Sequence, residues 1–531
     1  MQGLDDGVLM DILSRAVGPE RARAAFPAFS LPPSVSIRLN PFKCFASERI
    51  PSTPLHPLGG LRGGPLRLPE SHCSELSQPS VPGRVHPRFA AAEYGLSPAA
   101  ARNCTAADND QSHAVAPENS DSLVLKAVAN EDNATLGTRG GTVAERSGAS
   151  GGAERSEASE WSLPSGEDQP WSDYREVPWN RYGRMLGERP RFVMDPLFHA
   201  GCYYVQDSSA MVVGHMVREH LCRFDGLDRP VRVLDLCAAP GGKTTDLAAS
   251  LRERFGDGFQ LVANEVMRQR ASVLCDNVAV WGDPNVVVTS CDPKAFSRLE
   301  GYFDIIVTDV PCSGEGMFRK DPKAVEDWSP EAVSLCAARQ KRILADVWPA
   351  LRQGGLLVYS TCTFEEAEND ANVEWTASEL GAEVVGYDYS KLPGVIRTRT
   401  GGLLVPGFVE GEGQFVAVLE KTAPSLSSRQ GLEILHPLRS GLGKGTVKGR
   451  DFVPSADWAL SIFPPTDRYP SVDLDLGSAL KFLHRDGIFI EGQPEGYLMA
   501  CFEGHPLGFV KNIGKRWNNL HPQNRRIRID L

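Results

Sequence analysis

The chain has 531 residues, of which 41% are hydrophobic and 23% are charged, which is enough for about three to four folded domains. No apolar run reaches the roughly 18 residues that a membrane span needs, and the acidic, amphipathic start differs from a signal peptide. A cytoplasmic protein with no membrane partner is therefore expected. The net charge of −11 argues mildly against a polyanion partner, but local basic patches matter more for such partners than the total charge.

Residues 1–45 are predicted to form a small α+β region. An amphipathic helix is expected over about Gly7–Phe26, and the apolar–polar alternation of Ser34–Asn40 predicts a strand. Residues 46–170 are rich in Ser, Gly, Pro and Ala, so they cannot bury enough apolar surface to offset the entropy of ordering. We therefore predict a largely disordered insertion over residues 46–170.

Residues 171–229 are predicted to be the second part of the N-terminal region, with a helix starting at Asp207/Ser208. Strands and helices then alternate over residues 230–421. The expected strands are 231–237, 259–265, 285–291, 303–310, 355–362 and 415–420. The expected helices are Thr244–Phe255, Met267–Trp281, Pro330–Leu351 and Glu365–Leu380. This alternation predicts a parallel, doubly wound α/β sheet.

A polar break over Thr422–Gly431 separates a last region, residues 432–531. Short strands such as GIFIEG (487–492) and GYLMACFEG (496–504) predict a small α+β or barrel-like module. The end of this region is basic, because a single acid, Asp530, stands against Lys511, Lys515, Arg516, Arg525, Arg526 and Arg528.

Twelve cysteines are scattered along the chain, and no CxxC pair occurs. This spacing favours neither a disulfide framework nor a metal site, so no metal is expected. Individual thiols of a cytosolic protein can serve as nucleophiles, although a buried cysteine is more often an inert apolar residue. Cys222, Cys275 and Cys336 lie at expected helical positions and are assigned to that apolar role.

Chemically useful side chains follow the first five strands of the predicted sheet. The carboxyl ends of such strands line the ligand crevice of an open α/β sheet. The first strand is followed by LDLCAAPGGKTT (234–245), whose small residues permit a tight turn before a helix N-terminus. The remaining strands end in Asn264–Glu265, Cys291–Asp292, Asp309–Cys312 and Ser360–Cys362.

Single acids at such places are commonly helix caps or turn formers, but five successive strands that all end in reactive side chains favour a cofactor and reaction site. Glu265 suits two ribose hydroxyls, and Asp292 could meet an adenine amino group. The GGKTT segment also suggests a P-loop, but that motif requires a glycine at position 237, which is Cys237, so nucleotide hydrolysis is disfavoured.

The thiols on this rim suit a demanding reaction, methylation of carbon 5 of cytosine. A thiolate that adds to carbon 6 makes carbon 5 electron-rich, and a base must then remove the carbon 5 proton. Cys362, Cys312 and Asp309 could supply the nucleophile, the proton acceptor and the group for the pyrimidine edge. The chemistry by itself leaves either cysteine as the attacking group.

Four segments resemble the motifs of the Sun/Nol/Nop family of RNA cytosine-5 methyltransferases, namely LDLCAAPGGKTT, NEVMRQR, DVPCSGEGMFRKDP and YSTCTFEEAEND. The resemblance covers nearly all of residues 171–421, and SIRLNPFK and DPLFHAGCYYVQDSSAM resemble the N-terminal portion of the family. The PCSGEGMFRK form and the tail GHPLGFVKNIGKRWNNLHPQNRRIRI resemble the bacterial branch that methylates small-subunit (16S) ribosomal RNA, the methyltransferase F type, with its PUA-like RNA-binding module. The insertion at 46–170 is a departure from this pattern.

The resemblance implies a Rossmann-like class I methyltransferase fold and S-adenosyl-L-methionine as cofactor. It places Glu265 at the ribose, with Arg270 nearby, and Asp292 at the adenine edge. The methionine part would be wrapped by Cys237, Ala238, Ala239, Pro240, Gly241, Gly242 and Lys243.

The resemblance also assigns the catalytic roles. Cys362 would attack the base, Cys312 would assist release, and Asp309 would face both the cofactor and the target base. Lys243 would contact either the target base or the methionine carboxylate, and the resemblance does not distinguish these two roles.

RNA is the expected partner, in the form of 16S ribosomal RNA or the small ribosomal subunit. The protein is expected to be a monomer. Basic and aromatic residues after the Pro-Cys loop could line the RNA path, namely Arg319, Lys320, Lys323 and Trp328, and the basic tail with Trp517 could add a second surface. Such basic runs can also be solvated faces. Two other functions remain: the same chemistry on transfer RNA, and a non-catalytic RNA-binding assembly factor, which would need neither thiol.

Overall fold

The computed structural model describes residues 6–43, 174–426, 428 and 430–529. The predicted disordered insertion lies outside these residues. The segments on either side of it build one antiparallel sheet in the order β2-β3-β1-β4. Its strands are β1 (Val35–Leu39), β2 (Arg175–Val177), β3 (Asn180–Leu186) and β4 (Tyr203–Val205). The strand predicted over Ser34–Asn40 is thus confirmed, and it pairs with strands more than 140 residues away along the chain.

The N-terminal helix expected over Gly7–Phe26 is in fact two helices, α1 (Asp6–Val17) and α2 (Pro19–Ala25), followed by a 3-10 turn (Phe26–Ser30). The chain breaks at Gly18, whose φ of 85° is left-handed. Because proline disfavours a helical conformation in the residue before it and is favoured at the first position of a helix, Gly18–Pro19 ends one helix and starts the next.

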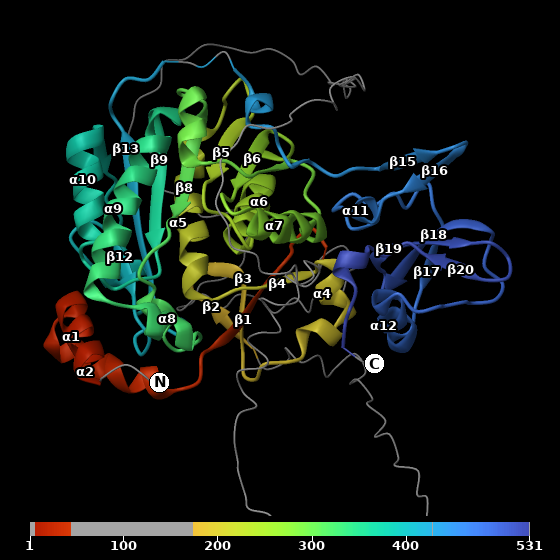
Figure 1. Ribbon diagram of the computed structural model, residues 1–531, viewed down its shortest axis with the longest axis horizontal. Helices are drawn as coiled ribbons and strands as arrows, with labels where there is room; N and C mark the ends of the chain where they lie inside the picture. The colour runs from red at the N-terminus through yellow and green to blue at the C-terminus, as the bar shows by residue number, and fades with distance from the viewer. Residues whose placement is uncertain (1–5, 44–173, 427, 429, 530–531) are drawn as a thin grey trace, which may run out of the picture. The chain divides into compact units, whose positions relative to one another are not determined.

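The central sheet has the order β11-β12-β13-β9-β8-β5-β6-β7-β14, and β10 pairs with β13 (Figure 1). Its strands are β5 (Val231–Asp235), β6 (Phe259–Asn264), β7 (Val286–Thr289), β8 (Phe303–Asp309), β9 (Leu351–Thr361), β10 (Ala382–Val384), β11 (Ile396–Arg397), β12 (Gly402–Leu404), β13 (Gln414–Lys421) and β14 (Arg439–Ser440).

Strands β5 to β9 are parallel, as predicted, but β13 is antiparallel to β9, so the sheet is mixed. The prediction of a wholly parallel sheet was wrong at this edge, because β11, β12 and β13 follow one another as an antiparallel meander and need no helical crossover. The strand order reverses between β5 and β8, which is the switch point where ligands bind in such sheets.

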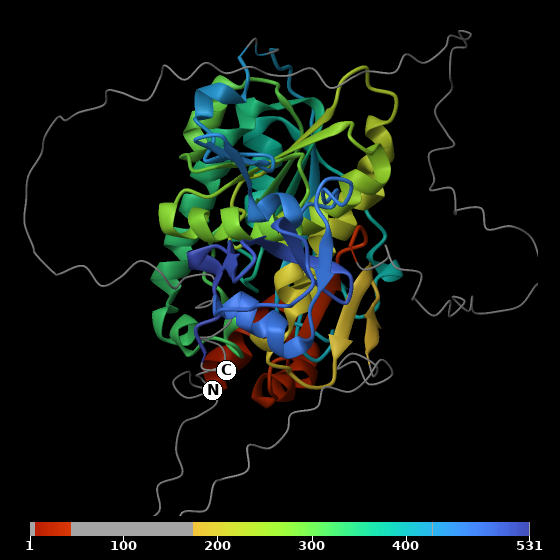
Figure 2. The same ribbon diagram turned by 90° about the vertical axis from the view of Figure 1, so that its right-hand side faces the viewer.

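Helices cover both faces of the parallel strands (Figures 1 and 2). Alternate strand residues divide between two cores: Val233 and Ile305 pack with α5, α6 and α7, whereas Leu234 and Ile306 pack with α9 and α10. The helices are α4 (Pro196–Ala200), α5 (Val212–His220), α6 (Gly242–Phe255), α7 (Arg268–Trp281), α8 (Pro322–Asp327), α9 (Pro330–Val347) and α10 (Asp370–Leu380). Strands buried on both faces explain the continuous apolar runs in the sequence.

Helix ends differ from the sequence prediction at three places. A 3-10 turn over Ser209–Met211 precedes α5. Helix α9 ends at Val347, because Pro349 has no N–H to continue it. Helix α10 starts at Asp370 rather than Glu365, after turns stabilised by the side chain of Asn369.

The C-terminal region contains a hairpin and a four-stranded sheet of order β17-β18-β19-β20. Its elements are β15 (Gly445–Lys448), β16 (Asp451–Pro454), α11 (Ala456–Ala459), β17 (Ser471–Asp473), α12 (Leu476–His484), β18 (Gly496–Phe502), β19 (His505–Asn512) and β20 (Trp517–Asn519). This is the predicted α+β module. The strand expected over 487–492 was wrong: that segment connects α12 to β18 without a pairing strand.

Candidate functional site

Two side chains of helix α7 donate hydrogen bonds to the loop between β5 and α6. Arg270 donates to the carbonyl of Ala239 at 2.9 Å, and Asn277 donates to the carbonyl of Pro240 at 2.8 Å. Gly241 has a φ of 117°, and a Cβ there would lie 3.2 Å from Leu274, so glycine suits this turn. Helix α6 begins at the next residue, and its free N–H groups therefore lie at this loop.

The predicted cofactor acids occupy the ends of β6 and β7. The Glu265 carboxylate accepts a hydrogen bond from the Met267 N–H at 2.9 Å and lies 3.1 Å from Arg270. Asp292 is exposed and accepts from the N–H of Lys294 at 3.0 Å, so it also has the capping role that a lone aspartate commonly has. Glu265 and Asp292 thus lie at neighbouring strand ends of the same rim.

Three side chains orient the Asp309 carboxylate at the end of β8. Lys243 donates to Oδ2 at 2.8 Å, and Ser360 and Gln414 donate to Oδ1 at 2.7 and 3.2 Å. Burial alone would lower the pKa of Lys243, but the neighbouring Asp309 carboxylate raises it, and the sulfur of Cys362 acts in the same direction. Lys243 therefore places a positive charge next to both Asp309 and Cys362.

The thiols of Cys312 and Cys362 are in contact. Their Sγ atoms lie 3.2 Å apart, and the backbone N–H of Cys362 points to the Cys312 sulfur at 3.3 Å. The hydrogen bond to Cys362, together with burial, raises the pKa of Cys312 well above its ordinary value. The chain thus brings together two thiols from the ends of adjacent strands, as the strand-end pattern predicted.

Glycine is needed at position 316, next to Cys362. The N–H of Gly316 donates to the carbonyl of Cys362 at 2.8 Å. A Cβ at position 316 would lie 2.7 Å from that oxygen, so any larger residue would push the Cys362 segment away.

A buried polar network supports the Cys312 loop, and the sequence analysis missed it. Glu368 is fully buried and accepts from the hydroxyl and N–H of Ser313 and from Gln340 at 2.6 Å. Gln340 also donates to the carbonyl of Pro311 at 2.9 Å, on the other side of Cys312. The segment FEEAEND carries several acids, and the sequence has no signal that separates Glu368 from them.

Two segments of the chain match models of known protein families. Residues 228–420 match the family model described as 16S rRNA methyltransferase RsmB/F, and residues 469–527 match the one described as methyltransferase RsmF PUA domain. We call the matched residues 228–420 the RsmB/F segment. The predicted resemblance to the methyltransferase F branch and the predicted class of fold are confirmed.

Two curated relatives are both named ribosomal RNA small subunit methyltransferase F. The chain is 39% identical to the one from Serratia proteamaculans over 48% of this chain and 53% of the relative. It is 39% identical to the one from Klebsiella pneumoniae over 42% of this chain and 46% of the relative. The matched region thus spans about half the length of these relatives. Among solved structures, a methyltransferase homolog protein from Pyrococcus horikoshii is 19% identical, covers 79% of this chain and 100% of its own, and has a TM-score of 0.45.

The predicted RNA path of the RsmB/F segment needs correction. Arg319 is almost fully buried against Glu412, at 2.7 Å, so it is unavailable to RNA phosphates. Lys320 pairs with Asp207 at 3.0 Å, and Trp328 donates to Glu315 at 2.6 Å. Lys323 remains exposed.

The basic tail is also partly structural. Arg525 forms ion pairs with Asp276 and Asp457 at 3.0 and 2.7 Å, and the Trp517 ring is buried in a core. The prediction that Trp517 forms part of an RNA surface was therefore wrong, and Arg525 is held by its ion pairs at the wall of a pocket. The tail residues that stay exposed are Lys515, Arg516 and Arg528.

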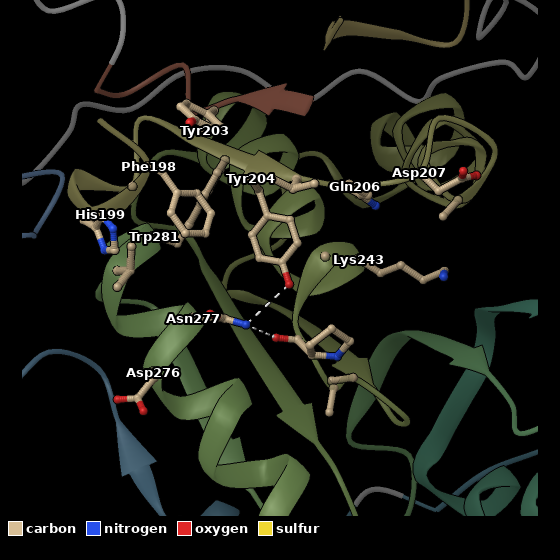
Figure 3. A pocket seen from close by; sticks show the side chains of 18 of the residues that line it. Phe198, His199, Tyr203, Tyr204, Gln206, Asp207, Lys243, Asp276, Asn277 and Trp281 are labelled. Atoms are coloured by element: carbon tan, nitrogen blue, oxygen red, sulfur yellow. Dashed lines mark hydrogen bonds between the residues drawn. The ribbon is translucent and has the colours of Figure 1, made fainter. Parts of the chain in front are cut away.

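A pocket of about 370 Å³ opens beside Lys243 and Asp309 (Figure 3). Its walls come from three parts of the chain: the segment from Phe198 to Asp207, the RsmB/F segment with its helix α7, and the C-terminal residues Leu460, His521 and Arg525. Neither Glu265 nor Asp292 lines it. In the described ranges no group of three or more potential metal ligands lies together, and no described helix is both long and apolar enough to cross a membrane.

Proposed function

We propose that the chain is an S-adenosylmethionine-dependent RNA cytosine-5 methyltransferase that acts on 16S ribosomal RNA of the small subunit and forms 5-methylcytosine. The observation that carries the proposal is the contact of two thiols, Cys312 and Cys362, beside the Lys243–Asp309 pair at the switch point of an RsmB/F methyltransferase sheet. We assign residues 230–421 to the methyltransferase domain and residues 432–531 to the RNA-binding region.

The rim fits S-adenosylmethionine. The Glu265 carboxylate can accept from two neighbouring hydroxyls of a ribose. Val266 and Met267 follow it with 56% and 55% of their surface exposed, which offers apolar contact to a purine ring. The turn at Cys237–Gly241 presents backbone N–H groups at a helix N-terminus, which suits a carboxylate. When bound, this cofactor supplies an electrophilic methyl group.

Cys362 is the nucleophile of the proposal. The Lys243 ammonium stabilises a negative charge on its sulfur, which is how thiolates are favoured in proteins. Cys312 has the raised pKa and keeps its proton, so we propose the other sulfur of the pair as the attacking group. The thiolate adds to carbon 6 of cytosine, which leaves carbon 5 electron-rich and able to accept a methyl group.

Asp309 and Lys243 match the polar edge of cytosine. A carboxylate accepts hydrogen bonds only, and the exocyclic amino group of cytosine donates them. Uracil has an oxygen at the same position, so Asp309 would repel it. Lys243 has two further protons for a ring acceptor or for the methionine carboxylate, and we propose the ring acceptor because Lys243 lines the pocket rather than the Glu265 side of the rim.

Cys312 assists the last step. After methylation the carbon 5 proton must leave before the bond between Cys362 and carbon 6 can break. The Cys312 thiol, 3.2 Å from Cys362, is placed to donate its S–H to the departing Cys362 sulfur, while the carbon 5 proton passes to solvent water.

RNA binding is assigned to the C-terminal module, with its exposed Lys515, Arg516 and Arg528, because cations on one surface attract phosphates. The enzyme would act in the cytoplasm, where its RNA is found, as a monomer.

The decisive experiment maps 5-methylcytosine by bisulfite sequencing of ribosomal and transfer RNA from a strain lacking the gene. We expect one small-subunit cytosine to lose its methyl group and to regain it with the wild-type gene but not with Cys362→Ala. A site in transfer RNA would instead favour the transfer RNA enzyme. An unchanged methylation pattern would favour the non-catalytic assembly factor.

The two cysteine variants separate attack from release. Cys362→Ala should abolish methyl transfer while binding S-adenosylmethionine with an unchanged Kd, because in the proposal its thiol contacts Cys312 and the base but not the cofactor. Cys312→Ala should accumulate a covalent enzyme–RNA adduct that survives denaturing gel electrophoresis. Half-buried Cys336 of α9 is the matched control, and Cys336→Ala should leave both readouts as in the wild type. Full activity of Cys362→Ala would overturn the assignment of the nucleophile.

A further inference from the structure

The pocket beside Lys243 is larger than the reaction of one base requires, because it continues from Asp309 to His521 of the C-terminal region. A volume of about 370 Å³ is in the range of sites that bind a whole small molecule. We infer that it binds a second, unpaired nucleotide of the RNA, next to the target cytosine. This inference rests on the proposed function, and it names a contact that would read the sequence around the target.

The pocket has the aromatic walls that unpaired bases use. Phe198, Tyr204 and Trp281 line it, from α4, β4 and α7. Figure 3 shows Tyr204 reaching from β4 toward Asn277 of α7, with the Lys243 side chain nearby. Unstacked RNA bases are commonly stacked on such rings, and a base taken out of its stack leaves its neighbour exposed as well.

Two amide groups in the pocket have orientations that the neighbouring groups determine. The Gln206 oxygen accepts from Nε of Arg38 at 2.9 Å, and because a guanidinium can only donate, the Gln206 NH₂ must face away from Arg38. The Asn277 NH₂ donates to the carbonyl of Pro240, so its oxygen faces the opposite way. Neither the Gln206 NH₂ nor the Asn277 oxygen has a partner in the part of the chain described. The pocket thus offers one donor and one acceptor for a base edge.

The charges of the pocket also suit RNA. Each of its three acids faces a cation: Asp309 faces Lys243, Asp207 faces Lys320, and Asp276 faces Arg525. Burial lowers the pKa of His199 to about 4 and that of His521 to about 3, so both rings are neutral at pH 7. A nucleotide entering the pocket therefore meets no uncompensated negative charge.

The methionine end of the cofactor is the rival occupant, since the pocket is lined by most of the loop that we assign to the methionine part, namely Cys237–Pro240 with Gly242 and Lys243. The two occupants predict different effects of Tyr204. If a base stacks on Tyr204, Tyr204→Ala should weaken RNA binding. If the cofactor occupies the pocket, Tyr204→Ala should instead weaken the binding of S-adenosylmethionine.

The test measures binding of the full chain to short single-stranded RNA oligonucleotides with a central cytosine and each of the four bases on either side. The Kd for RNA comes from fluorescence anisotropy, and the Kd for S-adenosylmethionine from calorimetry. Tyr204→Ala should raise the RNA Kd at least about fivefold, the lower end of the effect of base–aromatic stacking, while Tyr204→Phe should stay within about twofold. Exposed Tyr174 serves as the aromatic control, and Tyr174→Ala should leave the RNA Kd unchanged.

Gln206→Glu tests the reading of the base edge. The new carboxylate keeps an acceptor for Arg38 and replaces the free donor with an acceptor. The wild type should prefer a neighbouring G or U, whose exocyclic oxygen O6 or O4 accepts from the Gln206 NH₂, over A or C, which carry an amino group at that place. This preference should fall at least about fivefold in Gln206→Glu. Normal binding of S-adenosylmethionine shows that each variant is folded.

The inference is overturned if Tyr204→Ala leaves the RNA Kd unchanged. It is also overturned if Tyr204→Ala raises the cofactor Kd by the same factor, or if Gln206→Glu weakens all oligonucleotides equally. A wild type that binds with the expected preference but methylates no RNA would contradict the proposed function and leave the pocket assignment standing.

Discussion

Glu368 shares its carboxylate between two elements that carry the reaction. It binds the loop of Cys312 through Ser313 and helix α9 through Gln340. Burial raises the pKa of Glu368 to about 7 from its ordinary value of 4.5. The loop that holds Cys312 therefore depends on a group that changes its charge near neutral pH.

The stability of the chain should consequently depend on pH through Glu368. Because the folded chain binds its proton more tightly than the unfolded chain, folding takes up a proton between about pH 4.5 and 7. This contribution is full below pH 4.5 and is lost as the pH rises through about 7. The wild type should lose on the order of 3 kcal/mol of unfolding free energy over that window. Glu368→Gln should not show this decrease, because its side chain does not titrate. Urea unfolding at pH 5, 6, 7 and 8 measures it.

The control for this prediction is Glu366→Gln, since Glu366 lies two residues away with a side chain 59% exposed. The difference in unfolding free energy between Glu366→Gln and the wild type should be the same at all four pH values. A parallel pH profile for Glu368→Gln and the wild type would contradict the prediction.

Among the elements, strand β1 and helix α6 are joined by one buried side chain. Arg38 of β1 is fully buried, donates to the carbonyl of Gly242 at 3.1 Å and to the hydroxyl of Thr245, and lies with its guanidinium 4.6 Å from the centre of the Trp281 ring. The N-terminal sheet therefore holds the start of the helix that follows the cofactor loop. This contact explains why the strand over Ser34–Asn40 belongs to the catalytic unit.

Loss of this contact should destabilise the chain strongly. Arg38→Ala removes the donor from buried acceptors of α6 and removes one of the two cations next to Asp246. This loss should lower the unfolding free energy by at least about 3 kcal/mol. Chemical denaturation measures this value. Arg175 of β2 is exposed, so Arg175→Ala should cost less than about 1 kcal/mol as the control. Equal losses for both variants would refute the special role of Arg38.

At the scale of the whole molecule, Arg525 joins the C-terminal region to the RsmB/F segment. It contacts Asp276 of α7 and Asp457 of the C-terminal region, and the neighbouring Asn524 donates to Asp276 at 2.8 Å. Strand β14 adds a further link by pairing with β7. The C-terminal region is therefore attached to helix α7, which also donates hydrogen bonds to the loop between β5 and α6.

Arg525→Ala should loosen this attachment without unfolding the catalytic segment. Hydrogen exchange should become faster at residues 517–527 and at the end of α7, because buried Asp276 loses its cation and Asp457 keeps only Arg439. The Kd for S-adenosylmethionine should stay unchanged. Exposed Arg528 provides the control, and unchanged exchange in Arg525→Ala relative to Arg528→Ala would show that the ion pairs do not hold the module.

The amino-acid sequence by itself determined the elements and the rim of the site. Apolar runs and turn residues predicted the five parallel strands, and parallel strands must place Glu265, Asp309 and Cys362 at one edge. Local patterns were sufficient there, because each strand end is set by residues beside it in the chain.

Only the tertiary structure decided which side chains are partners. Arg319 looked available for RNA, but its partner Glu412 lies 93 residues away, and Arg525 is paired with Asp276 across 249 residues. Glu368 and the pocket around Tyr204 were also not visible in the sequence. Burial and pairing depend on packing between distant segments, and no local pattern of residues encodes that distance.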